Sequence, residues 1–531
     1  MSGRYKGYKN WNRRIGMKKN QYKQKSKYGK KIVIFCELLV LFLFIGSTIA
    51  VAASESSEKS AAAVPSLASE NPEFVKYQKN PSSPQPDASI GGRVMGYTPA
   101  PLDRRHFHHV SSAGVSLPAY YSSQDLQGTS TVSATQSGSS NPYYDLRTQS
   151  KVTSVKDQGS AGVCWAFATY GSLESCLMPG ENLDFSENNL KNLLSSAYPQ
   201  GFDRSANGGG NELMSTAYLA RWSGPVTESA DPYNSKSVDS PQNLPVQKHV
   251  QNVLFIPDRS GSLDNNEVKS AVLSNGALFT CMYYDSTRYN TTSHCYYYNG
   301  SSASNHAVVV VGWDDNFDKK RFKTTPPGNG AFIIKNSWGT GYGEKGYFYV
   351  SYYDSNIGKN NATFTAENLI NYNNIYQYDP LGFVASTGFN SPTAWCANIF
   401  TAKSNEVLKA VSFYTTDSNC NYEIYINNNS GSKPLSQTGL IPNQRGTIQY
   451  AGYYTVNLPG IPISAGKNFS VVLKLTTPNN NYPIPVERPI SQYSSKATAS
   501  SGQSFISNNG ITWTDITTRY RNTNVCIKAF S

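Results

Sequence analysis

The chain has 531 residues, of which 38% are hydrophobic and 12% aromatic, so it is long enough for two or more domains with apolar cores. Its formal net charge of +12 would suit a nucleic-acid-binding protein, but residues 1–31 hold 12 of the lysines and arginines and no acidic residue. The rest of the chain carries 35 basic and 35 acidic residues, which excludes a broadly basic surface for nucleic acid outside this stretch.

The basic stretch is followed by an apolar segment, residues 32–53, which is about long enough to cross a bilayer core. Residues 1–53 therefore predict an export element whose positive charges stay inside. Two outcomes remain open. The sequence AVA at residues 50–52 is typical of a signal-peptide cleavage site, whereas the length of the segment favours a single uncleaved membrane anchor. Either outcome places the rest of the chain at the cell surface or secreted, with membrane contact only through this segment.

The cysteines agree with export. Apart from Cys36 in the apolar segment and Cys164, which is considered below, an even number remains and allows up to three disulfides. These six are Cys176, Cys281, Cys295, Cys396, Cys420 and Cys526. Spacing does not fix connectivity, but the expected pairings are Cys281 with Cys295 and two of the last three cysteines with each other.

Residues 54–141 are rich in Ser, Pro, Ala and Gly and lack a sustained apolar period. This composition predicts a largely irregular pro-segment or linker. Half of the chain's histidines lie here, at His106, His108 and His109, where a solvated loop is expected rather than a metal site. The acidic loop after residue 313 likewise lacks the glycine and final glutamate of an EF-hand. No metal ion or other cofactor is expected.

Residues 142–370 have the patterning of an α+β domain. CWAFATYGSLESCLM, which begins at Cys164, has apolar residues at helical spacing, and SENNLKNLLSSA predicts a second helix with Ser186 as N-cap. HAVVVVGW and AFIIKNSW are β-branched runs that predict two strands joined by a long polar loop. His306 opens the first strand and Asn336 closes the second, so pairing of these strands would bring the two side chains together.

Residues 371–531 have a different texture. LKAVSFYT, YEIYINN, YYTVNL and FSVVLKL are short alternating strands separated by Gly, Pro and Asn turns. Helical patterning is almost absent. The pattern predicts an all-β sandwich domain.

Cys164 lies where a glycine-containing loop turns into the predicted helix, and a helix N-terminus lowers the pKa of a thiol. His306 is the expected base, and Asn336 the side chain that orients it. The backbone N–H of Cys164 and the side-chain amide of Gln158, six residues earlier, are expected to hold an oxyanion. Together these groups supply what nucleophilic amide hydrolysis requires.

Three blocks, DQGSAGVCWAF, NHAVVVVGW and KNSWGTGYGEKGYFYV, resemble the signature blocks of the papain family of cysteine peptidases, in the family's order. The resemblance implies a papain-like two-lobed fold, with a helical half that begins at Cys164 and a β-barrel-like half that carries His306 and Asn336. It implies a polypeptide substrate between the halves and no cofactor. Substrate contacts are expected at Gly208, Gly209, Asn305 and Trp338.

The resemblance also exposes two departures. Ala161 and Ala206 occupy the positions of two cysteines that the family usually bridges, as if a whole disulfide had been lost. The helical pro-domain common in papain zymogens is not visible. PEFVKY and GYTPAPLD instead resemble prokaryotic papain-family peptidases with a C-terminal lectin-like β-domain, and residues 371–531 resemble that domain, which implies by analogy a cell-surface glycan or envelope ligand.

The expected function is therefore an exported thiol protease, made as a zymogen, with an appended surface-binding domain. One alternative is a surface adhesin whose papain-like domain is a non-catalytic scaffold, but loss of catalysis usually shows as a replaced nucleophile or base, and both are present. A transglutaminase-type acyl transferase would have Asp where this chain has Asn336, and it would not explain Gln158.

Overall fold

The computed structural model describes residues 64–80, 86–87, 92–107, 141–435 and 439–531. The expected export segment at residues 32–53 lies outside these ranges, as do His108 and His109. Across the ranges described, no helix is long and apolar enough to cross a membrane. Below, residues 141–370 are called the α+β part, residues 371–531 the β part, and residues 64–107 the N-terminal segment.

The predicted helices at Cys164 and after Ser186 are confirmed, and the Ser186 side chain accepts a hydrogen bond from the Asn189 amide at 3.0 Å. The α-helices of the described ranges are α2 (Pro72–Lys79), α3 (Cys164–Leu177), α4 (Glu187–Leu193), α5 (Glu212–Ala220) and α6 (Asn266–Asn275). Helix α2 was not predicted. It begins after Asn71, whose side chain accepts from the Glu73 amide at 3.0 Å, a common N-cap contact.

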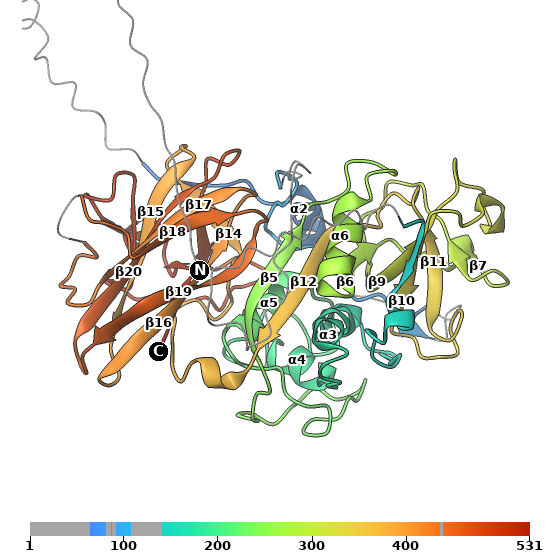
Figure 1. Ribbon diagram of the computed structural model, residues 1–531, viewed down its shortest axis with the longest axis horizontal. Coiled ribbons are helices and arrows are strands. Elements are labelled where there is room, and N and C mark those ends of the chain that lie inside the picture. The colour runs from blue at the N-terminus through green and yellow to red at the C-terminus, as the bar shows by residue number, and fades with distance from the viewer. Residues whose placement is uncertain (1–63, 81–85, 88–91, 108–140, 436–438) are drawn as a thin grey trace, which may run out of the picture. The chain divides into compact units, whose positions relative to one another are not determined.

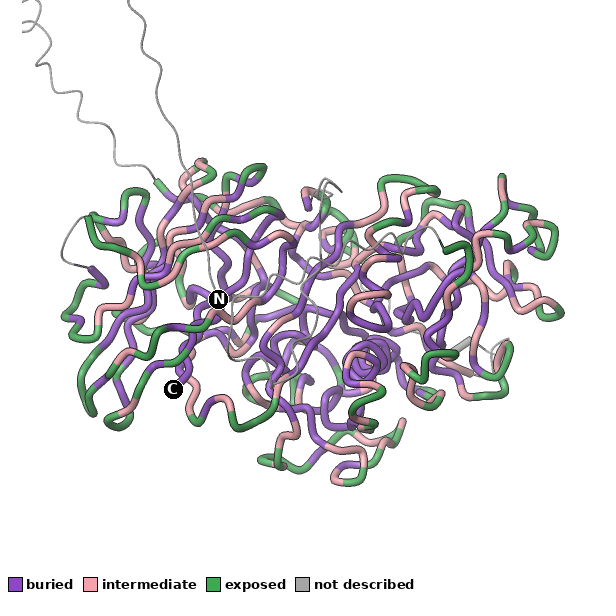
Figure 2. Tube along the Cα trace, viewed as in Figure 1, coloured by how far each residue is buried: buried purple, intermediate pink, exposed green. Residues whose placement is uncertain are grey.

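Helix α3 is the core helix of the α+β part. All of its residues except Cys176 are buried, and Figure 2 shows it as a coil with almost no exposed surface. A helix that is packed on every side cannot rotate or shift without disturbing its neighbours. Packing of α3 against the central strands therefore fixes the position of its first residue, Cys164.

One sheet runs through both parts of the molecule (Figure 1). Its strands, in spatial order, are β13 (Ile375–Tyr376), β25 (Ile527–Phe530), β16 (Glu406–Thr415), β19 (Gly452–Ile463), β5 (His249–Ile256), β12 (Lys359–Glu367), β6 (Leu278–Met282), β9 (His306–Asp314), β10 (Ala331–Lys335), β11 (Tyr347–Ser351), β8 (Cys295–Tyr296) and β7 (Tyr289–Asn290), and β4 (Tyr143–Asp145) pairs with β9. Strands β9 and β10 are neighbours in the sheet, as predicted, and they pair antiparallel with Lys335 opposite Val309. Strand β19 of the β part pairs with β5 of the α+β part, with Tyr453 opposite Val253.

The β part is the predicted sandwich. Its second sheet consists of β18 (Gln444–Ile448), β17 (Cys420–Asn427), β20 (Asn468–Thr476), β15 (Thr393–Thr401), β22 (Ser504–Ser507) and β23 (Thr514–Asp515). Val411 and Phe413 of β16 share one buried cluster with Val471 and Leu473 of β20. Alternate residues of facing strands thus form the core between two sheets.

The N-terminal segment is paired to the β part. A third sheet holds β1 (Ser66–Leu67), β14 (Ala385–Gly388), β21 (Ile484–Glu487) and β24 (Asn524–Val525), and a small ribbon holds β2 (Pro86–Asp87) and β3 (Arg93–Val94). Leu67 lies opposite Thr387, whose hydroxyl donates to the Ser66 carbonyl at 2.7 Å. Strand β1 is therefore an edge strand of a sheet whose other members all come from the β part.

The disulfide prediction is wrong for the cysteines described, because Cys164 and the six others are all free. Cys281 and Cys295 lie on β6 and β8, with three strands between them. Cys396 on β15 and Cys420 on β17 are separated by β20, which places them roughly 10 Å apart. A disulfide requires Cα atoms within about 7 Å.

Candidate active site

Cys164 is the first residue of α3 and is completely buried. Its sulfur accepts a hydrogen bond from the backbone N–H of Ala307 at 3.3 Å. Because Ala307 follows His306 at the start of β9, this contact holds the sulfur beside the histidine. Two segments that are far apart in sequence, the start of α3 and the start of β9, therefore meet at one point.

His306 is oriented from the neighbouring strand. Its Nε2 lies 2.9 Å from Oδ1 of Asn336, which directly follows β10 and whose Oδ1 also accepts from the Ser337 amide at 2.9 Å. Because Oδ1 only accepts, Nε2 carries the ring proton and Nδ1 is the basic nitrogen. Nδ1 is buried without a hydrogen-bond partner among the described residues. The indole of Trp338 stacks on the imidazole, with ring centroids 4.8 Å apart.

Gln158 lies at the same site with every polar atom engaged. Its Oε1 accepts from the Ser337 hydroxyl at 2.7 Å and from the Trp338 indole at 3.2 Å. Its Nε2 donates to the carbonyls of Val94 and Ala161, each at 2.9 Å. The amide that was expected to hold an oxyanion thus already holds a carbonyl oxygen from the N-terminal segment.

The N-terminal segment passes directly over the cysteine at Gly96. The Gly96 amide is close enough to the Cys164 sulfur to favour its charged form, which lowers the thiol pKa against the larger effect of burial. A Cβ atom on Gly96 would lie 2.0 Å from the Gly162 carbonyl oxygen, so only glycine allows this approach. The burial of the Cys164 side chain is therefore caused in part by a backbone laid across it.

The same segment is held on both sides of the site by main-chain hydrogen bonds. Gly210 donates to the Gly96 carbonyl and accepts from the Thr98 amide, both at 3.0 Å. On the other side, the Tyr97 amide donates to the Asn305 carbonyl at 3.0 Å. Backbone pairing of this kind is how extended peptides dock, independent of side-chain identity.

Burial changes the ionisation of both reactive groups. It raises the pKa of the Cys164 thiol to about 11 and lowers the pKa of the His306 ring to about 4. The sequence suggested a lowered thiol pKa from the helix N-terminus, and in this state the opposite holds because desolvation outweighs the helix dipole. A neutral thiol therefore lies beside a neutral imidazole.

The expected substrate-contact residues take different positions. The backbone carbonyls of Gly208 and Gly209 point into the protein, where they accept hydrogen bonds from the Arg204 guanidinium at 2.7 and 2.6 Å. The side-chain amide of Asn305 bonds the backbone of Tyr284 in both directions. Trp338 is 1% exposed, so its side chain packs against the residues of the site and does not form the wall of an open groove. The glycine that pairs with the N-terminal segment is Gly210, which sequence reasoning missed although it extends the NGG motif.

Hydrogen bonds link the two loops where Ala161 and Ala206 stand. The Gly162 amide donates to the Asn207 carbonyl at 2.9 Å, joining the cysteine loop to the glycine loop. The guanidinium of Arg204 also donates to the Ala206 carbonyl at 2.9 Å and lies over the ring of Trp165. A buried arginine thus supports the loop that a disulfide would otherwise join.

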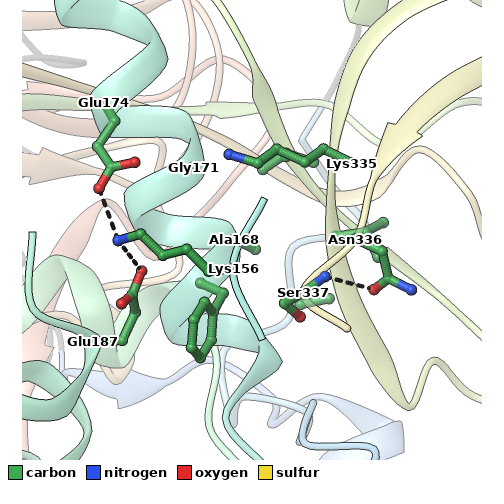
Figure 3. Close-up of a pocket in the computed structure, with 12 residues that line it drawn as sticks. Lys156, Ala168, Gly171, Glu174, Glu187, Lys335, Asn336 and Ser337 are labelled. Carbon is green, nitrogen blue, oxygen red and sulfur yellow. Dashed lines mark hydrogen bonds and ion pairs between the residues drawn. The ribbon is translucent and has the colours of Figure 1, made fainter. Parts of the chain in front are cut away.

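A cluster of charged residues lies behind the site, around a cavity of about 20 Å³ that is large enough for one water molecule (Figure 3). Lys156 bridges Glu174 of α3 and Glu187 of α4 at 3.3 and 2.8 Å. Burial raises the pKa of Glu187 to about 8 and lowers that of Lys335, at the end of β10, to about 8. This cluster joins the helices to the strand that carries Asn336.

Comparison with known proteins agrees with this arrangement. Residues 141–367 match the family model of papain family cysteine proteases, and residues 375–531 match that of a lectin like domain. The crystal structure of the cysteine protease and lectin-like domains of Cwp84, a surface layer associated protein of Clostridium difficile, is similar in fold. It has a TM-score of 0.70 and 24% identity, over 88% of this chain and 97% of that one.

Curated relatives match the α+β part. A cysteine protease of Blomia tropicalis is 28% identical over 245 residues, which are 42% of this chain and 65% of the relative. Cysteine proteinase 15A of Pisum sativum is 31% identical over 215 residues, which are 39% of this chain and 56% of the relative. The chain therefore spans between half and two thirds of the length of these two relatives.

Proposed function

We propose that this chain, which carries a papain-family cysteine protease domain at residues 141–367 and a lectin-like domain at residues 375–531, hydrolyses peptide bonds through Cys164, His306 and Asn336. The observation that carries the proposal is the position of the Cys164 sulfur. It is bonded to the backbone beside His306, whose Nε2 lies 2.9 Å from Asn336.

The proposed mechanism begins with transfer of the Cys164 proton to Nδ1 of His306. The thiolate attacks the substrate carbonyl carbon and forms a C–S bond, while Gln158 Nε2 and the Cys164 amide hold the oxyanion. The C–N bond breaks as His306 protonates the leaving amine. A water molecule, deprotonated by His306, then attacks the thioester, and the C–S bond breaks to release the acid and regenerate the cysteine.

The chain is proposed to be a latent precursor. Gly96 covers the sulfur and the Val94 carbonyl occupies the Gln158 amide, so a substrate cannot reach either group while the N-terminal segment is bound. The proposed organisation is an export element at residues 1–53, a pro-segment at 54–141, the peptidase at 142–370 and the lectin-like domain at 371–531. Removal of the pro-segment would rehydrate the cysteine and histidine.

We propose that the protein acts outside the cytoplasm, at the cell surface or secreted. Support comes from the basic and apolar pattern of residues 1–53 and from the structural likeness to Cwp84, which is described as surface layer associated. The lectin-like domain would bind a cell-surface glycan or envelope component and hold the peptidase near its polypeptide substrates.

The test compares two cysteine variants after removal of the pro-segment by an added protease. Cys164→Ala should reduce kcat/KM for a fluorogenic peptide by about 10⁴-fold or more, because the attacking atom is lost. The matched control is Cys176→Ala, which removes the half-exposed thiol on the same helix and should retain activity. Persistent hydrolysis by Cys164→Ala, with an unchanged melting temperature, would overturn the assignment of Cys164 as the nucleophile, whereas absence of hydrolysis by the processed unmodified protein would favour a non-catalytic scaffold.

A further inference from the structure

A buried ion pair joins the N-terminal segment to the α+β part. Arg104 donates to Glu212 at 2.6 Å, and the two side chains are 5% and 1% exposed. Within the described ranges, Arg104 is the one cation paired with this carboxylate. The second carboxylate oxygen of Glu212 is buried without a hydrogen-bond partner among those residues. Departure of Arg104 would therefore leave a buried negative charge uncompensated, which is costly.

The Arg104 guanidinium lies 5.5 Å from the centre of the Phe107 ring of its own segment, and its remaining neighbours come from the α+β part. It donates to the Asn361 carbonyl at 2.8 Å, on strand β12. It lies 4.6 Å from the centre of the Phe255 ring, on β5, and its charge acts on the carboxyl of the partly buried Asp258, which follows β5. A carboxylate, a carbonyl and an aromatic face together match the planar donors of a guanidinium.

This arginine pocket is adjacent to the substrate path. Tyr97 follows Gly96 and shares a buried cluster with Cys281, which lies opposite Ala307 in the sheet. The charge of Glu212 acts on both Tyr97 and Cys281. The pocket is thus connected, through Tyr97 and Cys281, to the point where the segment crosses the cysteine.

We propose that Glu212, the Asn361 carbonyl and Phe255 form a subsite that binds an arginine side chain of the polypeptide substrate once the N-terminal segment has left. The proposal rests on the proposed peptidase function, which it deepens by naming a substrate class. In the precursor, Arg104 occupies this subsite and shields it from substrate. The subsite is therefore both a lock for the segment and a specificity determinant of the released enzyme.

The first experiment uses the processed enzyme and a peptide series in which arginine or norleucine is placed at each position around the cleaved bond. At one position, arginine should raise kcat/KM about tenfold to a hundredfold over norleucine, as expected for a charge-assisted hydrogen bond. In Glu212→Gln, this ratio should fall to within about threefold of unity. Glu423→Gln, a matched change at the distant Glu423–Lys474 pair, should keep the wild-type ratio.

A second readout does not require catalysis. A synthetic peptide of residues 93–107 is titrated into processed protein by calorimetry, together with its Arg104→Met variant. The variant should bind about tenfold or more weakly, and this difference should disappear in Glu212→Gln protein.

The outcomes separate the two proposals. If peptides are cleaved with no arginine preference, or with a preference that persists in Glu212→Gln, the subsite is wrong and the peptidase stands. If no peptide is cleaved at all, the proposed function fails, and the calorimetric difference alone decides whether the arginine pocket exists. Equal binding of the two synthetic peptides would overturn the pocket.

Discussion

Cys164 and His306 have pKa values displaced in the directions that oppose an ion pair. The thiol pKa is raised to about 11 and the imidazole pKa lowered to about 4, in both cases because burial disfavours the charged form. At neutral pH both groups are therefore uncharged while the N-terminal segment is bound. Water that enters when the segment leaves would move the two pKa values toward each other and permit the thiolate–imidazolium pair.

Alkylation of Cys164 by iodoacetamide should report the change in its ionisation when the N-terminal segment leaves. Because Cys164 is completely buried and its thiol pKa is raised to about 11, the labelling rate of the full chain should be low at pH 7 and should rise with pH as more of the thiol ionises. After removal of the pro-segment the rate should be higher at pH 7 and nearly constant above it. Mass spectrometry of the labelled peptide measures both profiles, and identical profiles would contradict the burial argument.

The reactive residues were predictable because each lies in a short local pattern. The cysteine begins a helix, and the histidine and asparagine flank two β-branched runs, so pairing of the two strands brings them together. The contacts of Val94 and Gly96 were not predictable. They are made by main-chain atoms in a segment of low apolar content, and main-chain hydrogen bonds leave no side-chain signature.

At the scale of elements, the proposed latency would depend on the close fit of one extended segment against two loops. No side chain can be accommodated at Gly96, because an added methyl group would clash with the Gly162 carbonyl. Backbone atoms cannot move aside as the end of a side chain can. A single methyl group should therefore lift the segment from the cysteine.

Gly96→Ala is expected to make the uncleaved chain partly active and its Cys164 reactive toward iodoacetamide at neutral pH. Gly261→Ala is the matched control, because a Cβ atom there has nothing within 4 Å and latency should be retained. Peptidase assays of a non-processed sample, verified as full length by mass spectrometry, provide the measurement. A latent, unreactive Gly96→Ala protein would contradict the role of this contact.

Elements with strong periodicity were predicted well, and those that depend on distant partners were not. Helix α3 and strands β9 and β10 follow from apolar spacing alone. Helix α2 has only one buried residue, Phe74, so its apolar signal is weak although Asn71 and Pro72 are typical of a helix start. The pairing of β5 with β19 joins segments about two hundred residues apart, and no local pattern contains such information.

For the whole molecule, the shared sheet makes the two parts one structural body. Besides the β5–β19 pairing, the Tyr450 hydroxyl donates to Glu267 of α6 at 2.5 Å, and the Trp222 ring stacks on Phe530 at 5.2 Å. Strand β19 would present unpaired backbone groups if the α+β part unfolded first. The stability of each part is therefore tied to the other.

Differential scanning calorimetry of the full chain should show one cooperative transition rather than two. The reason is that neither part retains its complete sheet without the other. Tyr450→Phe, which removes one contact across the junction, should lower the free energy of unfolding by about 1 kcal/mol without splitting the transition. Two well-separated transitions in the unmodified chain would show that the junction does not couple the parts.

Strand β1 has a consequence for the timing of activation. Ser66 and Leu67 are hydrogen-bonded to β14, and Gly96 is hydrogen-bonded to Gly210 near Cys164. Cleavage of the chain between the N-terminal segment and the α+β part would therefore break one peptide bond but leave the segment bound at two separate places. The cleaved protein should remain inactive until the N-terminal segment dissociates. It should be inhibited again in a confined compartment that retains the cleaved segment. Cleavage and activation would then be separate events, and dilution of the cleaved segment would determine how soon activation follows cleavage.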